Sequence, residues 1–282
     1  MAFMRMSRRG ISIFGLSRQA PMIPLILTLL LIQNAPLRAE PSAAVALLDG
    51  GAEAQTHSAG VEITLSGQTK TYWRMPGDSG LPPVFDWSAS ENVARVAVEW
   101  PRPERIADPS GTILGYHTRV IFPLRVTTSD AAKPMTLRLK LDFAICEDLC
   151  VPVSANAAVK LGAGPARAAI DAFRARVPQA GTLGQGPDPR LVAIGPDPAR
   201  ADALIVTTGA PVDDLILEGP KGWYFGDASR IGGTDAAPIF RVLALEKPTK
   251  GRFAGLTLTL TLLGPTSATE TTLTLDADGA IR

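Results

Sequence analysis

The sequence predicts a mainly β protein, with a β-sandwich in its first half, a second, smaller β-rich domain after it and one connecting helix. Polar and apolar residues alternate over many short segments, as in half-buried strands. Proline and glycine separate these segments often enough to give short strands with frequent turns, which is typical of sandwiches. Only one segment has a convincing helical spacing of apolar residues. We expect domains at residues 40–163 and 199–282, with the helix and a linker over 164–198.

The first 39 residues have the composition of an export signal. Four arginines without any acid precede an apolar run of twelve residues, 21–32. This run is too short to span a bilayer of about 30 Å, and Leu37-Arg38-Ala39 is a suitable cleavage site. Cleavage after Ala39 would remove five arginines and change the formal net charge from +1 to −4, so we expect no general affinity for nucleic acid. An uncleaved anchor and a twin-arginine export route remain alternatives.

In the first domain, period-two alternation predicts strands. Residues 40–60 lack it, and their start is expected to be loose. Met75 to Pro83 contains three prolines and two glycines, which predicts a loop. Pro123 predicts an edge position or a bulge in its strand. The expected strands cover residues 61–65, 93–100, 116–126, 135–145 and 157–161.

The clearest of these strands leads to the only two cysteines, Cys146 and Cys150. Apolar residues from Met135 to Ile145 share one face, and polar residues occupy the other. If the alternation continues, Cys146 points away from the core towards solvent, as an exchanging thiol requires. A turn at Pro152 and a returning strand would place both cysteines at the tip or flank of a β-hairpin.

In the second half, residues 166–177 predict the helix, which Pro178 ends. Gly181 to Pro198 contains four prolines and four glycines and is expected to be a linker. The expected strands of the second domain are residues 204–208, 215–217, 223–225, 239–245, 256–263 and 271–275.

The cysteine spacing limits the chemistry of the pair. A disulfide across so short a loop stabilises a fold by roughly 2 kcal/mol, against about 4.7 for a 100-residue loop. The spacing therefore favours thiol–disulfide exchange or capture of a soft metal such as Cu(I) over a structural disulfide, which stays an alternative. Glu147 and Asp148 lie between the sulfurs and should disfavour a thiolate. His117 or Met75 could join a copper site only through folding.

Other candidate residues are weaker. His57, in a polar and mobile segment, and His117, on a strand, are expected to be ordinary polar residues. No serine-centred elbow or paired-carboxylate motif stands out, and no cofactor is expected. Five aromatic residues are expected in the core of the sandwich or at its rim. In a functional alternative, some of them shield the disulfide. They are Tyr72, Trp73, Phe85, Trp87 and Trp100.

Several long segments resemble the periplasmic N-terminal domain of DsbD/ScsB-type thiol–disulfide reductases. They are Thr71 to Pro83, Ser90 to Val93, Trp100 to Arg105 and Leu141 to Pro152. The resemblance covers residues 50–162, whereas residues 190–282 fit only in their β character. It implies an immunoglobulin-like sandwich in the periplasm that carries a redox pair, Cys146 and Cys150. Cys150 would attack client disulfides, Cys146 would resolve the product, and the loop from Tyr72 to Gly77 would help to cover the pair.

The resemblance also implies partners. A membrane-embedded electron donor of the DsbD/ScsB/CcdA type would reduce the pair, and periplasmic thioredoxin-fold proteins would be its clients. The sequence departs from the family in its shorter cysteine spacing and in lacking the membrane and C-terminal thioredoxin-like domains, so a separate donor is expected. The chain would then be one component of a thiol–disulfide oxidoreductase system. The alternatives are a Cu(I)-binding or copper-tolerance protein that uses the same two sulfurs, and a non-catalytic interaction module with a structural disulfide.

Overall fold

The computed structural model describes residues 42–77, 80–108, 111–147, 149–209, 211–249 and 251–281. The expected signal peptide, its cleavage site at Ala39 and the acidic residue Asp148 lie outside these ranges. No helix within them has the length and apolar character needed to cross a membrane.

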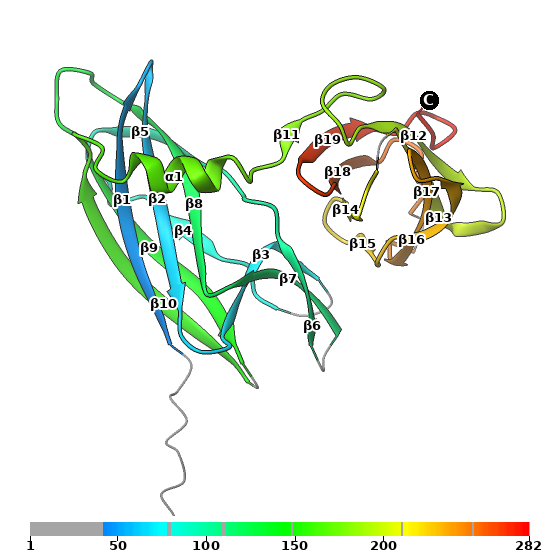
Figure 1. Ribbon diagram of the computed structural model, residues 1–282, viewed down its shortest axis with the longest axis horizontal. Helices are drawn as coiled ribbons and strands as arrows, with labels where there is room; N and C mark the ends of the chain where they lie inside the picture. Colours follow the sequence, from blue (N-terminus) through cyan, green and yellow to red (C-terminus); the bar gives the residue numbers. More distant parts are fainter. Residues whose placement is uncertain are drawn as a thin grey trace, which may run out of the picture. The chain divides into compact units, whose positions relative to one another are not determined.

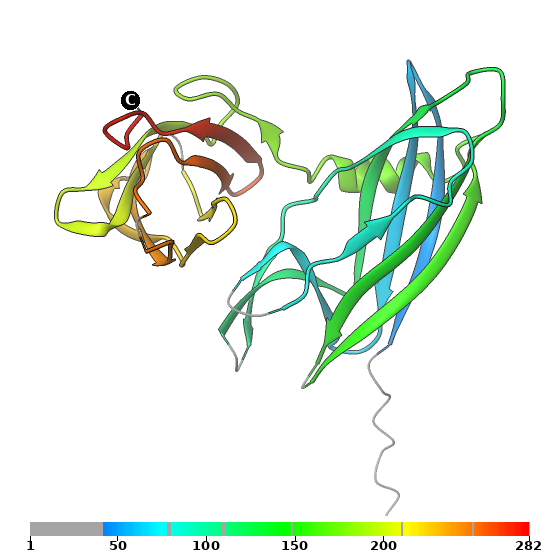
Figure 2. The ribbon, with the colours of Figure 1, turned by 180° about the vertical axis from the view of Figure 1, so that it is seen from behind.

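The first sandwich consists of two antiparallel sheets (Figures 1 and 2). One sheet contains, in order, β1 (Ala43–Glu53), β2 (Thr56–Leu65), β8 (Arg119–Thr128) and β5 (Val93–Val98). The other contains β10 (Cys150–Lys160), β9 (Thr136–Cys146), β3 (Lys70–Gly77), β7 (Gly111–His117) and β6 (Glu104–Asp108), and the short β4 (Val84–Asp86) also pairs with β9. Figure 2 shows the long green β9–β10 hairpin. Its register begins with the pair Cys146 and Cys150.

Apolar side chains from both sheets form the core between them. Val61 and Ile63 from β2 and Leu137, Leu139 and Leu141 from β9 are at most 2% exposed, as their alternation predicted. The fold class, mainly β with a sandwich, is therefore confirmed. Among the aromatic candidates, Trp73 is fully buried in this core, and Phe85, Trp87 and Trp100 pack against it.

Three expectations about the first sandwich were wrong. The start of residues 40–60 is not loose, since strand β1 begins at Ala43 and pairs with β2 in a hairpin; pairing along the ladder can stabilise strands whose own sequence is rich in small residues. Residues 116–126 do not form one strand: Thr118, at φ +59°, ends β7, and β8 continues in the other sheet.

Pro123 lies in the inner strand β8, opposite Gly60 on β2, and not at an edge. On the other side of β8, β5 ends at Val98, and the Glu99 amide donates to the Pro123 carbonyl. The missing amide hydrogen of the proline therefore faces the end of β5, where the paired ladder has stopped. An inner strand tolerates proline there because no regular ladder bond is lost.

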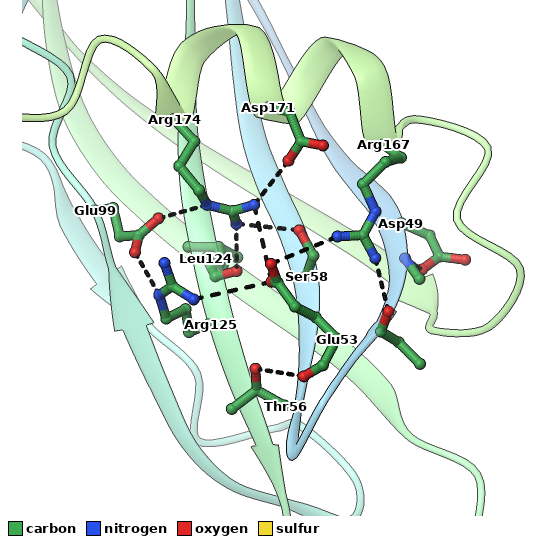
Figure 3. A network of polar contacts seen from close by, with 12 residues as sticks. Asp49, Glu53, Thr56, Ser58, Glu99, Leu124, Arg125, Arg167, Asp171 and Arg174 are labelled. Carbon is green, nitrogen blue, oxygen red and sulfur yellow. Dashed lines mark hydrogen bonds and ion pairs between the residues drawn. The ribbon is translucent and has the colours of Figure 1, made fainter.

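The predicted helix forms as α1 (Arg167–Arg174) and lies across β1, β2 and β8 (Figure 1). Ile170 is fully buried against the sheet, and Gly50 and Gly60 leave room for it: a Cβ on either glycine would come within 2.9 Å or 3.2 Å of the Ile170 side chain. Figure 3 shows the polar network around this contact, in which Arg174 Nε donates to Glu99 Oε2 at 2.8 Å.

The second sandwich also has two sheets. One contains β11 (Gln179–Ala180), β19 (Ala268–Thr274), β18 (Thr257–Leu263) and β14 (Asp214–Glu218). The other contains β12 (Leu191–Asp197), β13 (Arg200–Thr208), β17 (Ala237–Glu246) and β15 (Tyr224–Phe225), with β16 (Ser229–Thr234) paired to β17. All six strands that the sequence predicted in this region are present.

The expected linker is shorter than predicted, because its last residues form strand β12. Gly195 and Pro196 made this segment resemble a linker, but it pairs with β13 and buries Leu191 and Ile194. Strand β16 was also missed, because all six of its residues are exposed and give no alternation.

Candidate redox site

The two cysteines face each other across the end of the β9–β10 hairpin. Cys146 is the last residue of β9, Cys150 is the first of β10, and the two are direct partners in the register with their Cα atoms 4.1 Å apart. A disulfide joins them. The Glu147 amide donates to the Leu149 carbonyl at 3.3 Å in the turn between them. The expected place of the pair at a hairpin is confirmed, but the turn lies between the cysteines and not at Pro152, which is part of β10.

The two sulfurs differ in their environment. Cys146 is 1% exposed, whereas Cys150 is an exposed residue. The expectation that Cys146 faces solvent was therefore wrong. Cys146 does lie on the outer side of its sheet, but a small apolar cluster covers that side; its members are Tyr72, Ile106, Ile113, Ala144 and Cys146.

Tyr72 of β3 is the residue that connects this cluster to the disulfide. Its ring is fully buried, and its hydroxyl oxygen lies 2.7 Å from Cys146 Sγ and 3.1 Å from Cys150 Sγ. The sequence singled out Tyr72 as an aromatic core or rim residue, with shielding of the disulfide as the functional alternative, and as part of a covering loop. The signal that could have found it is its phase: Tyr72 alternates with the buried Trp73, so it faces the other side of the sheet, where Cys146 lies.

Gly80 lies directly against the Tyr72 ring. A Cβ at Gly80 would lie 2.2 Å from Tyr72 Cε1, and its φ of +134° is a conformation that residues with side chains rarely adopt. The covering loop expected from Tyr72 to Gly77 is part of strand β3 instead, and Gly80, which contacts the tyrosine, follows that strand. Because only glycine fits here, this contact constrains the position of the ring over the sulfurs.

Exposed apolar residues precede and follow Cys150 in the sequence. Leu149, inside the cysteine loop, is 78% exposed, and Val151, directly after Cys150, is 42% exposed. Exposed apolar side chains grouped together often mark a surface that contacts another molecule. On the same hairpin, the Ser154 hydroxyl donates to the Asp142 carboxylate and holds the pKa of Asp142 below its ordinary value, so this side chain is ionised at neutral pH.

The other candidates lie apart from the sulfurs. His57 is on β2, where its Nε2 lies 3.6 Å from Asp49 Oδ1 and is largely buried, so the mobile segment expected there was wrong. His117 Nδ1 lies 3.1 Å from Glu104 Oε2. Met75 packs against the main core. Within the described ranges, no three His, Cys, Asp or Glu side chains are grouped as metal ligands, and Cu(I) binding by the two sulfurs alone stays a prediction.

Comparison with known proteins agrees with this geometry. Residues 35–161 match the family described as thiol:disulfide interchange protein DsbD, N-terminal. This part of the chain is therefore similar to a DsbD N-terminal domain, and the family's name connects that family with thiol–disulfide interchange. No curated protein matches the sequence.

A solved structure shows the same fold over a longer stretch. The crystal structure of the N-terminal periplasmic domain of ScsB from Proteus mirabilis matches with a TM-score of 0.64 and 19% identity. The match covers 84% of this chain and 93% of the ScsB chain. At this identity it establishes a shared fold, and it extends beyond the residues that match the DsbD family.

Proposed function

We propose that this protein is a periplasmic thiol–disulfide exchange protein that passes reducing equivalents through Cys146 and Cys150 to client proteins. The single observation that carries the proposal is the unequal exposure of two bonded cysteines: residue Cys150 is exposed, and residue Cys146 is buried in contact with Tyr72. A structural disulfide needs no such difference. An exchanging pair benefits from it, because one sulfur must meet the client and the other must be protected until it resolves the product.

The reaction follows from this arrangement. In the reduced protein, the Cys150 thiolate attacks one sulfur of a client disulfide, and the other client sulfur leaves as a thiolate. The Cys146 thiolate then attacks Cys150 Sγ, the mixed disulfide breaks, and the client leaves with both sulfurs reduced. The two electrons come from the protein, which ends with the Cys146–Cys150 disulfide. A separate reductant must restore the two thiols.

We propose a membrane-embedded electron donor of the DsbD/ScsB/CcdA type as that reductant, and periplasmic thioredoxin-fold proteins as clients. The similarity of residues 35–161 to the DsbD family supports both assignments. The export-like first 39 residues and the description of the ScsB domain as periplasmic support the location.

Leu149 and Val151 form the proposed contact with clients. They lie on either side of Cys150 in sequence and expose apolar surface at the cysteine end of the hairpin. Replacing Leu149 with serine should lower the exchange rate with a protein client and leave the rate with a small disulfide unchanged, because a small disulfide needs no apolar docking surface.

The test of the exchange function uses the two single cysteine variants. The Cys146→Ser variant should accumulate a mixed disulfide with a thioredoxin-fold client, visible on a non-reducing gel, because the resolving sulfur is missing. The Cys150→Ser variant should form none and lose exchange. A control variant on the same strand, Asn156→Ser, is exposed and lies away from the sulfurs, and it should behave as the parent protein.

Unchanged exchange in both cysteine variants would rule the proposal out. A reduction potential well below about −300 mV would instead support a structural disulfide, since such a bond resists biological reductants.

A further inference from the structure

A lysine lies beside the buried sulfur. The register pairs Lys70 of β3 directly with Cys146 of β9. Directly opposed residues of antiparallel strands project from the same face of the sheet, with their Cβ atoms about 4.5–5.5 Å apart. Tyr72, two residues along β3, shares this face and contacts both sulfurs. Lys70 and Cys146 are therefore neighbours on the outer side of the sheet.

Lys70 is also enclosed. Only 7% of the residue is exposed, and lysine is rarely buried to this extent. Its strand neighbour on the other side is His117, which pairs with Glu104. One row across the sheet thus contains Cys150, Cys146, Lys70 and His117, in the order of their strands.

The groups around Cys146 determine how readily its thiol ionises, and a cation beside it would favour the thiolate. Tyr72 donates from β3, Cys150 faces it from β10, and Glu147 follows it in the turn. Glu147 disfavours a second negative charge on the sulfur. A nearby positive charge lowers the pKa of a thiol by favouring the thiolate. Lys70, the register partner of Cys146 on the adjacent strand, is the residue that can supply this charge.

We propose that Lys70 is a positioning residue of the redox pair, whose ammonium group stabilises the Cys146 thiolate after reduction. This inference rests on the proposed function, and it assigns Lys70 to the resolving step. In that step the Cys146 thiolate attacks Cys150 Sγ in the mixed disulfide, the bond from Cys150 to the client breaks, and the client thiolate leaves. The ammonium group keeps its proton and acts only through its charge.

The test measures the Cys146 thiol directly, without any client. In the reduced Cys150→Ser protein, Cys146 is the only thiol, and its ionisation can be followed by the ultraviolet absorbance of the thiolate. Adding Lys70→Met, which keeps a long apolar stem and removes the charge, should raise the pKa of Cys146 by about one unit or more. Lys70→Arg retains the cation and should leave the pKa close to that of the parent.

A second variant and a control make the result specific. Lys70→Gln is a second neutral variant, for the case in which Lys70→Met does not fold. Lys160→Met removes an exposed lysine at the other end of β10 and should leave the pKa of Cys146 unchanged. A merely structural role for Lys70 would alter stability in the neutral variants without moving this pKa.

In the protein with both cysteines, the charge of Lys70 should also affect the rate at which Cys146 releases the client. Lys70→Met should slow release of the client from the mixed disulfide about three- to fourfold at neutral pH for each unit of pKa rise, because the smaller thiolate fraction is partly offset by the greater nucleophilicity of a more basic thiolate. The pH–rate profile should shift to higher pH by the same number of units as the pKa. A folded neutral variant with the parental Cys146 pKa would overturn the role of Lys70. That result would leave the exchange function intact, because the two single cysteine variants test that function separately.

Discussion

The Tyr72 hydroxyl lies 2.7 Å from Cys146 Sγ and joins two residues that are 74 positions apart in the sequence. The same hydroxyl lies 3.1 Å from Cys150 Sγ, so one donor reaches both ends of the disulfide. A thiolate accepts a stronger hydrogen bond than a neutral sulfur does. The hydroxyl is therefore placed to stabilise whichever sulfur becomes charged when the disulfide opens.

Replacing Tyr72 with phenylalanine tests this relationship. The variant keeps the ring that fills the outer cluster and loses only the hydroxyl. A hydrogen bond of about 1 kcal/mol corresponds to about a fivefold change in rate, so we expect thiol–disulfide exchange to slow about fivefold. Stopped-flow exchange with a small disulfide would measure it.

Tyr116→Phe is the matched control. Tyr116 is also buried, but its hydroxyl donates to the Pro101 carbonyl at 2.7 Å, within the main core. This variant should lose stability by about 1 kcal/mol and exchange at the parental rate. Equal exchange rates in Tyr72→Phe and the parent would show that the hydroxyl has no part in the reaction.

Gly80→Ala should loosen the contact over Tyr72. The new Cβ would lie 2.2 Å from Tyr72 Cε1, so the ring or the segment must move. We expect a loss of about 1–3 kcal/mol in stability from overpacking and faster reduction of the disulfide by dithiothreitol. In the control Gly67→Ala, at φ +57°, a Cβ meets no atom within 4 Å, so backbone strain alone should lower stability. An unchanged reduction rate in Gly80→Ala would contradict the idea that this contact shields the pair.

Arg174→Met should weaken the attachment of α1. Arg174 is 16% exposed and donates to Glu99 at 2.8 Å, Asp171 at 2.9 Å and Ser58 at 3.0 Å (Figure 3). Removing it leaves Glu99, 18% exposed, with one fewer cation, although Arg125 still lies 2.6 Å from that carboxylate. We expect a loss of about 2 kcal/mol in the free energy of unfolding, measured by urea denaturation.

The control for this prediction is Arg138→Met. Arg138 pairs with Glu91 at 2.9 Å, but the two side chains are 46% and 62% exposed. Solvent screens such a pair, so its loss should change the free energy of unfolding by less than about 1 kcal/mol. A similar loss of unfolding free energy in both arginine variants would show that the α1 network contributes no more to stability than an exposed ion pair.

The ion pair of Asp197 should make the stability of the protein depend on pH. The Ala199 amide donates to its carboxylate at 2.8 Å and Arg241 pairs with it at 2.5 Å, and these contacts hold the pKa of Asp197 below its ordinary value in the folded state. The stabilisation is therefore present above the unfolded value of about 3.9 and is lost as the pH falls through the lower folded value. Asp197→Asn should be less stable than the parent at neutral pH, with the difference shrinking below about pH 4. A difference in Tm that stays constant with pH would contradict this.

Local patterns predicted much of the fold. The alternation from Met135 to Ile145 established the strand before the cysteines, and helical spacing of apolar residues established α1, because both patterns depend only on near neighbours. Residues 43–53 gave no such pattern, and β1 forms because β2 supplies its ladder partners. Pro123 was placed at an edge because the sequence does not show where the neighbouring strand stops.

The sequence by itself determined that two cysteines lie on a β-hairpin and that Cys146 occupies the side of its strand away from the main core. Only the tertiary structure decided that this side is covered, that Tyr72 reaches both sulfurs and that Lys70 lies beside Cys146. The physical reason is that alternation assigns a residue to one face of a strand, whereas the residues that cover that face come from β3, β6 and β7. These strands reach β9 only through the long-range pairing of β3 with β7 and with β9.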